Sequence, residues 1–174
     1  MGVIPFLQEA AKLPAEDTVA LEIASVNPSG TTRISVLRLP RIANFDDLDP
    51  LRLEPSVKLG FVGPGEAIPG DSHLVIIPGS KSTVSDLAAL RREGWDIDLA
   101  AHLRRGGHVI GLCGGYQMLG RAIHDPEGLE GKAGSVAGLG HLDVETVLKP
   151  DKTLTEVAAR HVASGLSLTG YEIH

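Results

Sequence analysis

The chain has 174 residues, 43% hydrophobic and 22% charged, a composition typical of a soluble globular protein with a sizeable core. The net charge of −6 and an aromatic content of only 3% make a nucleic-acid partner unexpected. A single cysteine rules out an internal disulfide framework, and no apolar run reaches the ~20 residues of a membrane span. We therefore expect a cytoplasmic protein without membrane contact.

Residues 1–32 contain too few apolar side chains for a core of their own. The stretch 2–6 is predicted to end a strand, 8–13 to form a short helix, and 27–30 to form a turn or linker. We interpret residues 1–32 as the tail of a preceding domain plus a linker, and residues 33–174 as the principal domain.

Predicted strands and helices alternate after residue 32, which is typical of a parallel sheet with helices on both faces. The elements expected are strands at 34–39, 57–62 and 73–77, helices around 83–90 and 99–103, and an apolar strand at 109–112. Thr83 and Asp86 have the spacing of a capping box at the start of the first helix. The predicted fold is a three-layer α/β sandwich with a mostly parallel central sheet.

The pattern changes after Gly120. Residues 125–138 are rich in glycine, glutamate and lysine, and we predict that they form a surface excursion. Alternating apolar residues over 142–147 predict an antiparallel edge strand, and a last strand is predicted over 166–173.

The most informative stretch is Gly111-Leu112-Cys113-Gly114-Gly115, which follows an apolar strand and precedes a predicted helix. This is the cysteine version of the Gly-x-nucleophile-x-Gly elbow, a turn too tight for side chains at the flanking positions. The elbow lifts the nucleophile clear of the sheet and allows the N–H of Gly114 to face an oxyanion. The alternative is a lone buried cysteine that packs as a small hydrophobe. The glycine pattern favours Cys113 as a nucleophile.

Two other candidate sites are less specific. The turn at 79–83 is similar in composition to a phosphate loop, but Ser80 separates Gly79 from Lys81 and the Walker A spacing fails. Its backbone N–H groups can supply a second oxyanion donor at the carboxyl end of a strand, and a plain strand-to-helix turn is the alternative. Among seven histidines, His174 ends a predicted strand at the expected edge of the sheet. No cluster has metal-ligand spacing, so no metal is predicted.

Several segments resemble those of the class I, triad-type glutamine amidotransferases, namely residues 78–83, 111–120 and 170–174. Residues 38–51 are similar to the start of the glutaminase domain in the cobyric acid synthase family in particular. Residues 2–6 and 13–17 look like the end of the ATP-dependent synthetase domain that precedes it. The resemblance covers essentially the whole chain, and it implies a flavodoxin-like sandwich.

The resemblance also implies a mechanism. Cys113 attacks the side-chain amide of glutamine, forms a thioester and releases ammonia, and the N–H groups of Gly79 and Gly114 form the oxyanion hole. The residues placed against the glutamine are Gln117, Tyr171, Glu172 and His174. This domain has no cofactor of its own. ATP and Mg²⁺ belong to the synthetase domain, where carboxylates of adenosylcobyrinic acid a,c-diamide become amides during cobalamin biosynthesis.

The chain departs from the family pattern in two respects. The family's catalytic histidine follows the Gly-Tyr-Glu-Ile-His segment in a Tyr-x-His-Gly type motif that this sequence does not contain, and most of the synthetase domain is missing. We therefore expect a fragment with its nucleophile and oxyanion hole but without its base, and hence slow turnover. The alternatives are the glutaminase of a cobyrinic acid a,c-diamide synthase or of a cell-wall isoglutaminyl synthase, or a truncated module that only binds a partner.

Overall fold

The structure is a computed structural model that describes residue 27, residues 29–151 and residues 154–173. The predicted strand end at 2–6 and the predicted helix at 8–13 lie outside the described residues, as does His174.

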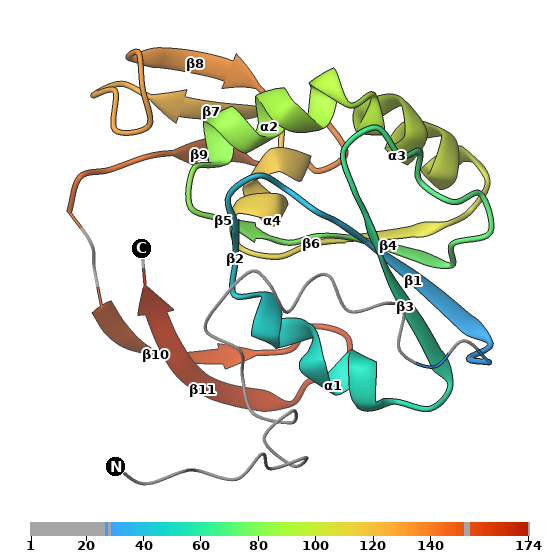
Figure 1. Cartoon of the computed structure of the whole chain (residues 1–174). Coiled ribbons are helices and arrows are strands. Elements are labelled where there is room, and N and C mark those ends of the chain that lie inside the picture. Colours follow the sequence, from blue (N-terminus) through green and yellow to red (C-terminus); the bar gives the residue numbers. More distant parts are fainter. Residues whose placement is uncertain (1–26, 28, 152–153, 174) are drawn as a thin grey trace, which may run out of the picture.

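Four parallel strands form the central sheet (Figure 1): β1 (Thr32–Leu37), β3 (Val57–Val62), β4 (Leu74–Ile77) and β6 (His108–Gly111). Their order across the sheet is β3-β1-β4-β6. Counted along the chain this is 2-1-3-4, the flavodoxin-like order, which confirms the predicted fold class. Val36 on β1 and Val75 on β4 are fully buried, as expected for central strands covered on both faces.

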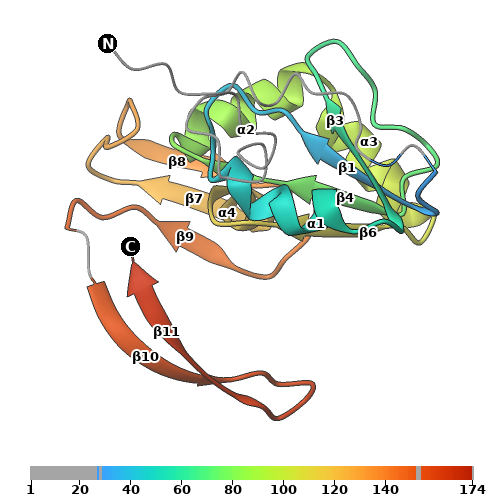
Figure 2. The same ribbon diagram turned by 60° about the horizontal axis from the view of Figure 1, so that its bottom comes forward.

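Helices cover both faces of this sheet (Figures 1 and 2). One face carries α2 (Thr83–Arg92), α3 (Trp95–Arg104) and the short α4 (Gly114–Leu119), and their core is built around Trp95. The other face carries the 3-10 helix η3 (Phe45–Leu48) and α1 (Asp49–Leu53), with Leu48 packed in a second apolar cluster. In the part of the chain that the structure describes, no helix combines the length and apolarity needed to span a bilayer.

A second sheet follows α4 and contains β7 (Ala122–Asp125), β8 (Gly134–Ala137) and β9 (Glu145–Val147), in the order β8-β7-β9. The stretch predicted as a surface excursion therefore includes a strand, β8. The predicted antiparallel edge strand is β9, and its predicted direction is wrong because β9 pairs parallel with β7. Alternation of apolar residues indicates which face a strand buries, but it does not indicate the direction of the neighbouring strand.

The C-terminal part of the described chain is an antiparallel hairpin of β10 (Leu154–Arg160) and β11 (Ser167–Ile173). β11 agrees with the strand predicted over 166–173, whereas β10 was not predicted. The sequence of β10, Leu-Thr-Glu-Val-Ala-Ala-Arg, contains alanine and glutamate, which are depleted in strands. The hairpin belongs to neither of the larger sheets, and Figure 2 shows it below the rest of the domain.

Candidate active site

Cys113 connects β6 to α4 in a strained backbone conformation. Its φ is 48° and its ψ is −111°, outside the regions that residues with a Cβ ordinarily occupy. The residue is exposed. Strain of this kind persists only where the surrounding structure enforces it, and it gathers at functional sites.

The two flanking glycines explain how the conformation is enforced. A Cβ on Gly111 would lie 2.5 Å from the carbonyl carbon of Gly115. A Cβ on Gly115 would lie 2.1 Å from the carbonyl oxygen of Ile77, at the end of the neighbouring strand. Both distances are far below contact range, so neither position accepts a side chain. The strand-to-helix elbow predicted at Cys113 is confirmed.

A small ladder brings a second backbone segment to the elbow. β2 (Ile42–Ala43) pairs antiparallel with β5 (Gly79–Ser80), and the N–H of Lys81 donates to the carbonyl of Arg41 at 2.9 Å. Hydrogen-bonded and non-bonded pairs alternate in such a ladder, so the N–H of Gly79 faces Ala43. The N–H of Ser80 points the other way, and its nitrogen lies 3.2 Å from where a Cβ on Gly114 would stand.

The predicted capping box at the start of α2 is wrong. Ser82, not Thr83, is the N-cap residue, and its side chain makes no capping hydrogen bond within the helix. The carboxylate of Asp86 turns away from the helix and accepts hydrogen bonds from the N–H of Arg41 at 3.1 Å and from the hydroxyl of Ser80 at 2.7 Å. Asp86 is fully buried, and its Oδ1 has no hydrogen-bond partner among the described residues. Asp86 therefore holds the β2–β5 ladder instead of capping α2.

Thr83 connects α2 to α4. Its side chain is 3% exposed, and its hydroxyl donates to Oε1 of Gln117 at 3.1 Å. A Cβ on Gly114 would lie 3.1 Å from the same hydroxyl oxygen. The structure therefore brings together four of the predicted site residues: Gly79, Cys113, Gly114 and Gln117.

The remaining predicted site residues belong to the C-terminal segment. Tyr171 and Glu172 are exposed on β11, whose strand partner is β10, and 71% of Tyr171 is accessible to solvent. His174 lies outside the described residues. The role of these three residues remains a prediction.

Several described histidines hydrogen-bond to groups other than Cys113. His102 is 1% exposed, and its Nε2 lies 3.0 Å from the carbonyl oxygen of His108, so it is a buried histidine with a hydrogen-bond partner. His124 bonds Ser135, and His161 bonds Ser164. Within the described residues, no group of three or more histidine, cysteine, aspartate or glutamate side chains is arranged to hold a metal ion.

One contact at the site was missed by sequence reasoning. The carboxylate of Glu130, on the connection between β7 and β8, accepts a hydrogen bond from the N–H of Val84 at 2.8 Å and lies 3.4 Å from the donating hydroxyl of Ser82. The loop is held by Asp125, which is 4% exposed and accepts bonds from the N–H groups of Leu129 and Glu130. Those bonds, chiefly that from Glu130, hold the pKa of the Asp125 carboxyl below its usual range.

The fold and the elbow together define a class of protein: an α/β sandwich with an exposed cysteine held in a strand-to-helix elbow at the carboxyl edge of a parallel sheet. The family described as the CobB/CobQ-like glutamine amidotransferase domain matches residues 33–174, and the chain belongs to this family.

Three similar proteins share one name. The chain is 64% identical over 173 residues to a cobyric acid synthase of Rhodobacter capsulatus, 62% over 173 residues to that of Bradyrhizobium diazoefficiens and 60% over 174 residues to that of Methylocella silvestris. These matches cover 99–100% of the chain but only 36% of each relative. Among solved structures, "Structure of PurLQS from Thermotoga maritima" matches with a TM-score of 0.54 at 18% identity, covering 83% of this chain and 66% of that one. This likeness shows the fold alone.

Proposed function

We propose that this chain is the glutaminase part of a cobyric acid synthase. The observation that carries the proposal is the strained elbow at Cys113, whose flanking positions admit no side chain. The identity of 60–64% to proteins named cobyric acid synthase supports this enzyme over other amidotransferases.

The proposed reaction has two steps. The sulfur of Cys113 bonds to the side-chain carbonyl carbon of glutamine, the carbon–nitrogen bond breaks, and the thiol proton leaves with the nitrogen as ammonia. Water then cleaves the thioester, which releases glutamate and restores the thiol. The first step develops negative charge on the carbonyl oxygen, and backbone N–H groups aimed at that charge lower the barrier.

We assign the oxyanion contacts to the N–H of Gly114 and to the N–H of Ser80. The Ser80 N–H replaces the Gly79 N–H that the resemblance implies, because the Gly79 N–H faces Ala43 in the β2–β5 ladder. The proximity of the Ser80 nitrogen to Gly114 supports a donor from this segment. Gln117, fixed by Thr83, would contact the glutamine. Tyr171, Glu172 and His174 would join the site once β11 lies against it.

The rest of the proposal concerns the whole enzyme. The chain spans 36% of the length of its curated relatives. Residues 1–32 would be the tail of a synthetase domain with its linker, and ammonia would pass from Cys113 to that domain. There ATP and Mg²⁺ would activate carboxylates of adenosylcobyrinic acid a,c-diamide for amidation. The base that assists Cys113 would come from a part of the whole enzyme that this chain does not include.

A labelling experiment tests the function. 6-Diazo-5-oxo-norleucine carries the glutamine backbone, and its diazo carbon takes up the sulfur and proton of a thiol while N₂ leaves. We expect this reagent to modify Cys113 in the 174-residue chain, as read by mass spectrometry, and glutamine to block the modification. Glutamine hydrolysis is expected to be slow, because loss of a general base typically costs about 100- to 10,000-fold.

Cys113→Ala is the control, and it should abolish both labelling and hydrolysis. Fast hydrolysis that depends on Cys113 would show that the base lies within the chain. A folded chain that neither reacts with the reagent nor hydrolyses glutamine would contradict the proposed function.

A further inference from the structure

The first turn of α2 is capped by a residue that is remote in sequence. The N–H groups at the start of a helix have no partner within the helix and need one elsewhere. The N-cap residue Ser82 supplies none from its side chain. Glu130, 48 residues after Ser82, takes its place by accepting hydrogen bonds from the N–H of Val84 at 2.8 Å and from the hydroxyl of Ser82 at 3.4 Å.

The turn that Glu130 holds forms one wall of the candidate active site. It contains Thr83, whose hydroxyl binds Gln117 and lies next to Gly114. It also follows Ser80, whose hydroxyl accepts the N–H of Ser82 at 3.0 Å. A shift at the start of α2 is therefore transmitted to the residues that surround the carbonyl oxygen of a bound glutamine.

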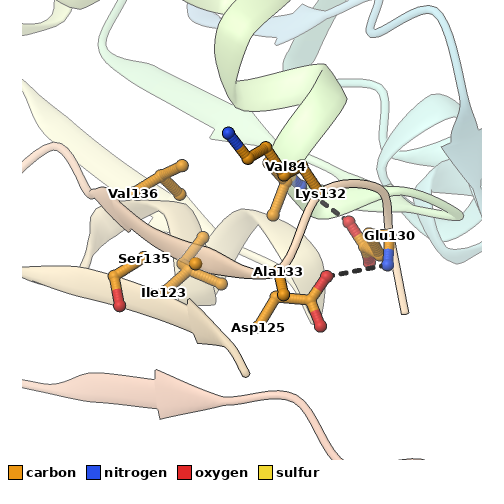
Figure 3. Close-up of a pocket in the computed structure, with 9 residues that line it drawn as sticks. Val84, Ile123, Asp125, Glu130, Lys132, Ala133, Ser135 and Val136 are labelled. Atoms are coloured by element: carbon orange, nitrogen blue, oxygen red, sulfur yellow. Dashed lines mark hydrogen bonds between the residues drawn. The ribbon is translucent and has the colours of Figure 1, made fainter. Parts of the chain in front are cut away.

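Glu130 is presented by a preformed loop. Its own N–H donates to Asp125 at 2.8 Å, and Leu129 donates to the same carboxylate at 2.7 Å. Figure 3 shows the two bonds in succession, from Asp125 to Glu130 and from Glu130 to Val84. Because Asp125 fixes the loop beforehand, little conformational entropy remains to be lost when Glu130 binds α2.

The contact between Glu130 and α2 lies beside an open pocket. A cavity of about 300 Å³ lies between the loop and α2, bounded by apolar side chains of Val84, Ile123 and Val136 and by the loop residues Glu130 and Lys132 (Figure 3). The hydrogen bonds of Glu130 join this loop to the start of α2.

We propose that Glu130 is a positioning residue for glutamine hydrolysis. It does not touch the substrate. It fixes the first turn of α2, and through Thr83 it fixes Gln117 and the oxyanion wall opposite Cys113. The inference rests on the proposed function, and it assigns the connection between β7 and β8 a part in the chemistry.

The test compares two reagents on the single cysteine of the chain. 6-Diazo-5-oxo-norleucine needs the glutamine site and a polarised carbonyl, whereas iodoacetamide needs only an accessible thiol. In Glu130→Ala we expect the limiting rate of labelling by the glutamine analogue to fall about 10- to 100-fold, the effect of a misplaced reacting group. The iodoacetamide rate should stay within about twofold of wild type. Glu130→Gln keeps one acceptor oxygen. Its rate of labelling by the glutamine analogue should lie between those of wild type and Glu130→Ala.

Two matched variants control for unrelated losses. Glu127→Ala removes an exposed carboxylate from the same loop. Glu93→Ala removes a carboxylate that accepts a backbone N–H, that of Gly65 at 2.8 Å, far from Cys113. Both should label at the wild-type rate with both reagents, and the circular dichroism of every variant should match that of wild type.

Each other outcome overturns the inference. An unchanged rate in a folded Glu130→Ala chain would show that the cap has no role in positioning. An equal fall with both reagents would mean that Glu130 only governs access to the thiol. If Glu130→Ala does not fold, Glu130→Gln decides, and a wild-type rate there overturns the inference. Failure of the wild-type chain to label with the glutamine analogue, with iodoacetamide still reacting, would instead refute the proposed function.

Discussion

At the scale of single residues, the sequence predicted correctly those features that are determined by adjacent residues in the chain. Gly111, Cys113 and Gly115 are recognisable because the elbow is formed by neighbouring residues. The two glycines stand at positions that have no room for a Cβ. The roles of Thr83 and Asp86 were predicted wrongly, because their partners, Gln117, Arg41 and Ser80, come from other segments. A capping motif in the sequence is a local preference that a tertiary contact overrides.

The steric demand at Gly115 gives a prediction whose sign is opposite to helix propensity. Alanine is usually better than glycine inside a helix by about 1 kcal/mol. At Gly115 the added Cβ meets the carbonyl of Ile77 at 2.1 Å, so we expect Gly115→Ala to lower the free energy of unfolding by about 3 kcal/mol. Urea denaturation measures the change.

Gly60→Ala is the matched control for this prediction. Gly60 lies on β3, and a Cβ there meets nothing within 4 Å. The free energy of unfolding of the Gly60→Ala variant should stay within about 1 kcal/mol of that of wild type. Equal effects of the two substitutions would show that crowding by Ile77 is not what requires glycine at the elbow.

At the scale of elements, the sequence predicted the strands and helices of the central sheet better than the pairing of the strands that follow it. β3 was predicted with the bounds it has, because its apolar residues alternate along the strand and a proline–glycine pair ends it. The direction of β9 was wrong, and the contact between the β7–β8 connection and α2 was not foreseen. Both features are contacts between segments that are distant in the sequence. The periodicity of a single sequence does not indicate such contacts.

The β7–β8 connection gives a prediction about pH. The lowered pKa of Asp125 means that the folded state stabilises the carboxylate, chiefly through the N–H of Glu130. This stabilisation is present at pH values above the ordinary aspartate pKa and is lost as the pH falls through the lower pKa of the folded state. We expect the stability advantage of wild type over Asp125→Asn to be constant near neutral pH and to shrink under acid conditions.

Chemical denaturation of both proteins between about pH 3 and pH 7 measures this difference. Asp47→Asn, at an exposed aspartate on η3, is the control for a general effect of charge. An advantage that grows as the pH falls would contradict the assigned hydrogen bonds.

At the scale of the whole molecule, strand–helix alternation was sufficient to predict the architecture, whereas the surroundings of β6 could not be predicted. β6 leads into the elbow at Cys113, yet among the described residues it has a strand neighbour only on the β4 side. The N–H groups of His108 and Leu112 donate to β4-side carbonyls, so the alternate ones, on Val109 and Gly111, point away from the sheet.

Hydrogen exchange measured by NMR tests this arrangement. We expect the amide of Val109 to exchange at least about 100-fold faster than that of Ile110, since only the second is held by the β4 ladder. Ser35 and Val36 on β1, which has neighbours on both sides, are the control and should both be protected. Equally slow exchange at Val109 and Ile110 would mean that the outer edge of β6 is covered in solution, by the β10–β11 hairpin or by a second copy of the chain.

The backbone at Cys113 has a consequence for how inactive forms of this protein should be made. A positive φ of 48° is adopted more readily by glycine than by any residue with a Cβ. The side chain to which we assign the nucleophile therefore strains the backbone at this position. On the proposed function, alanine or serine at this position would keep the backbone strain and abolish the reaction of the thiol. Glycine would also abolish the reaction, but it would relieve the backbone strain. A trapped or catalytically silent form intended for structural work is best built with Cys113→Gly, and gains in robustness that preserve activity have to be sought at other positions.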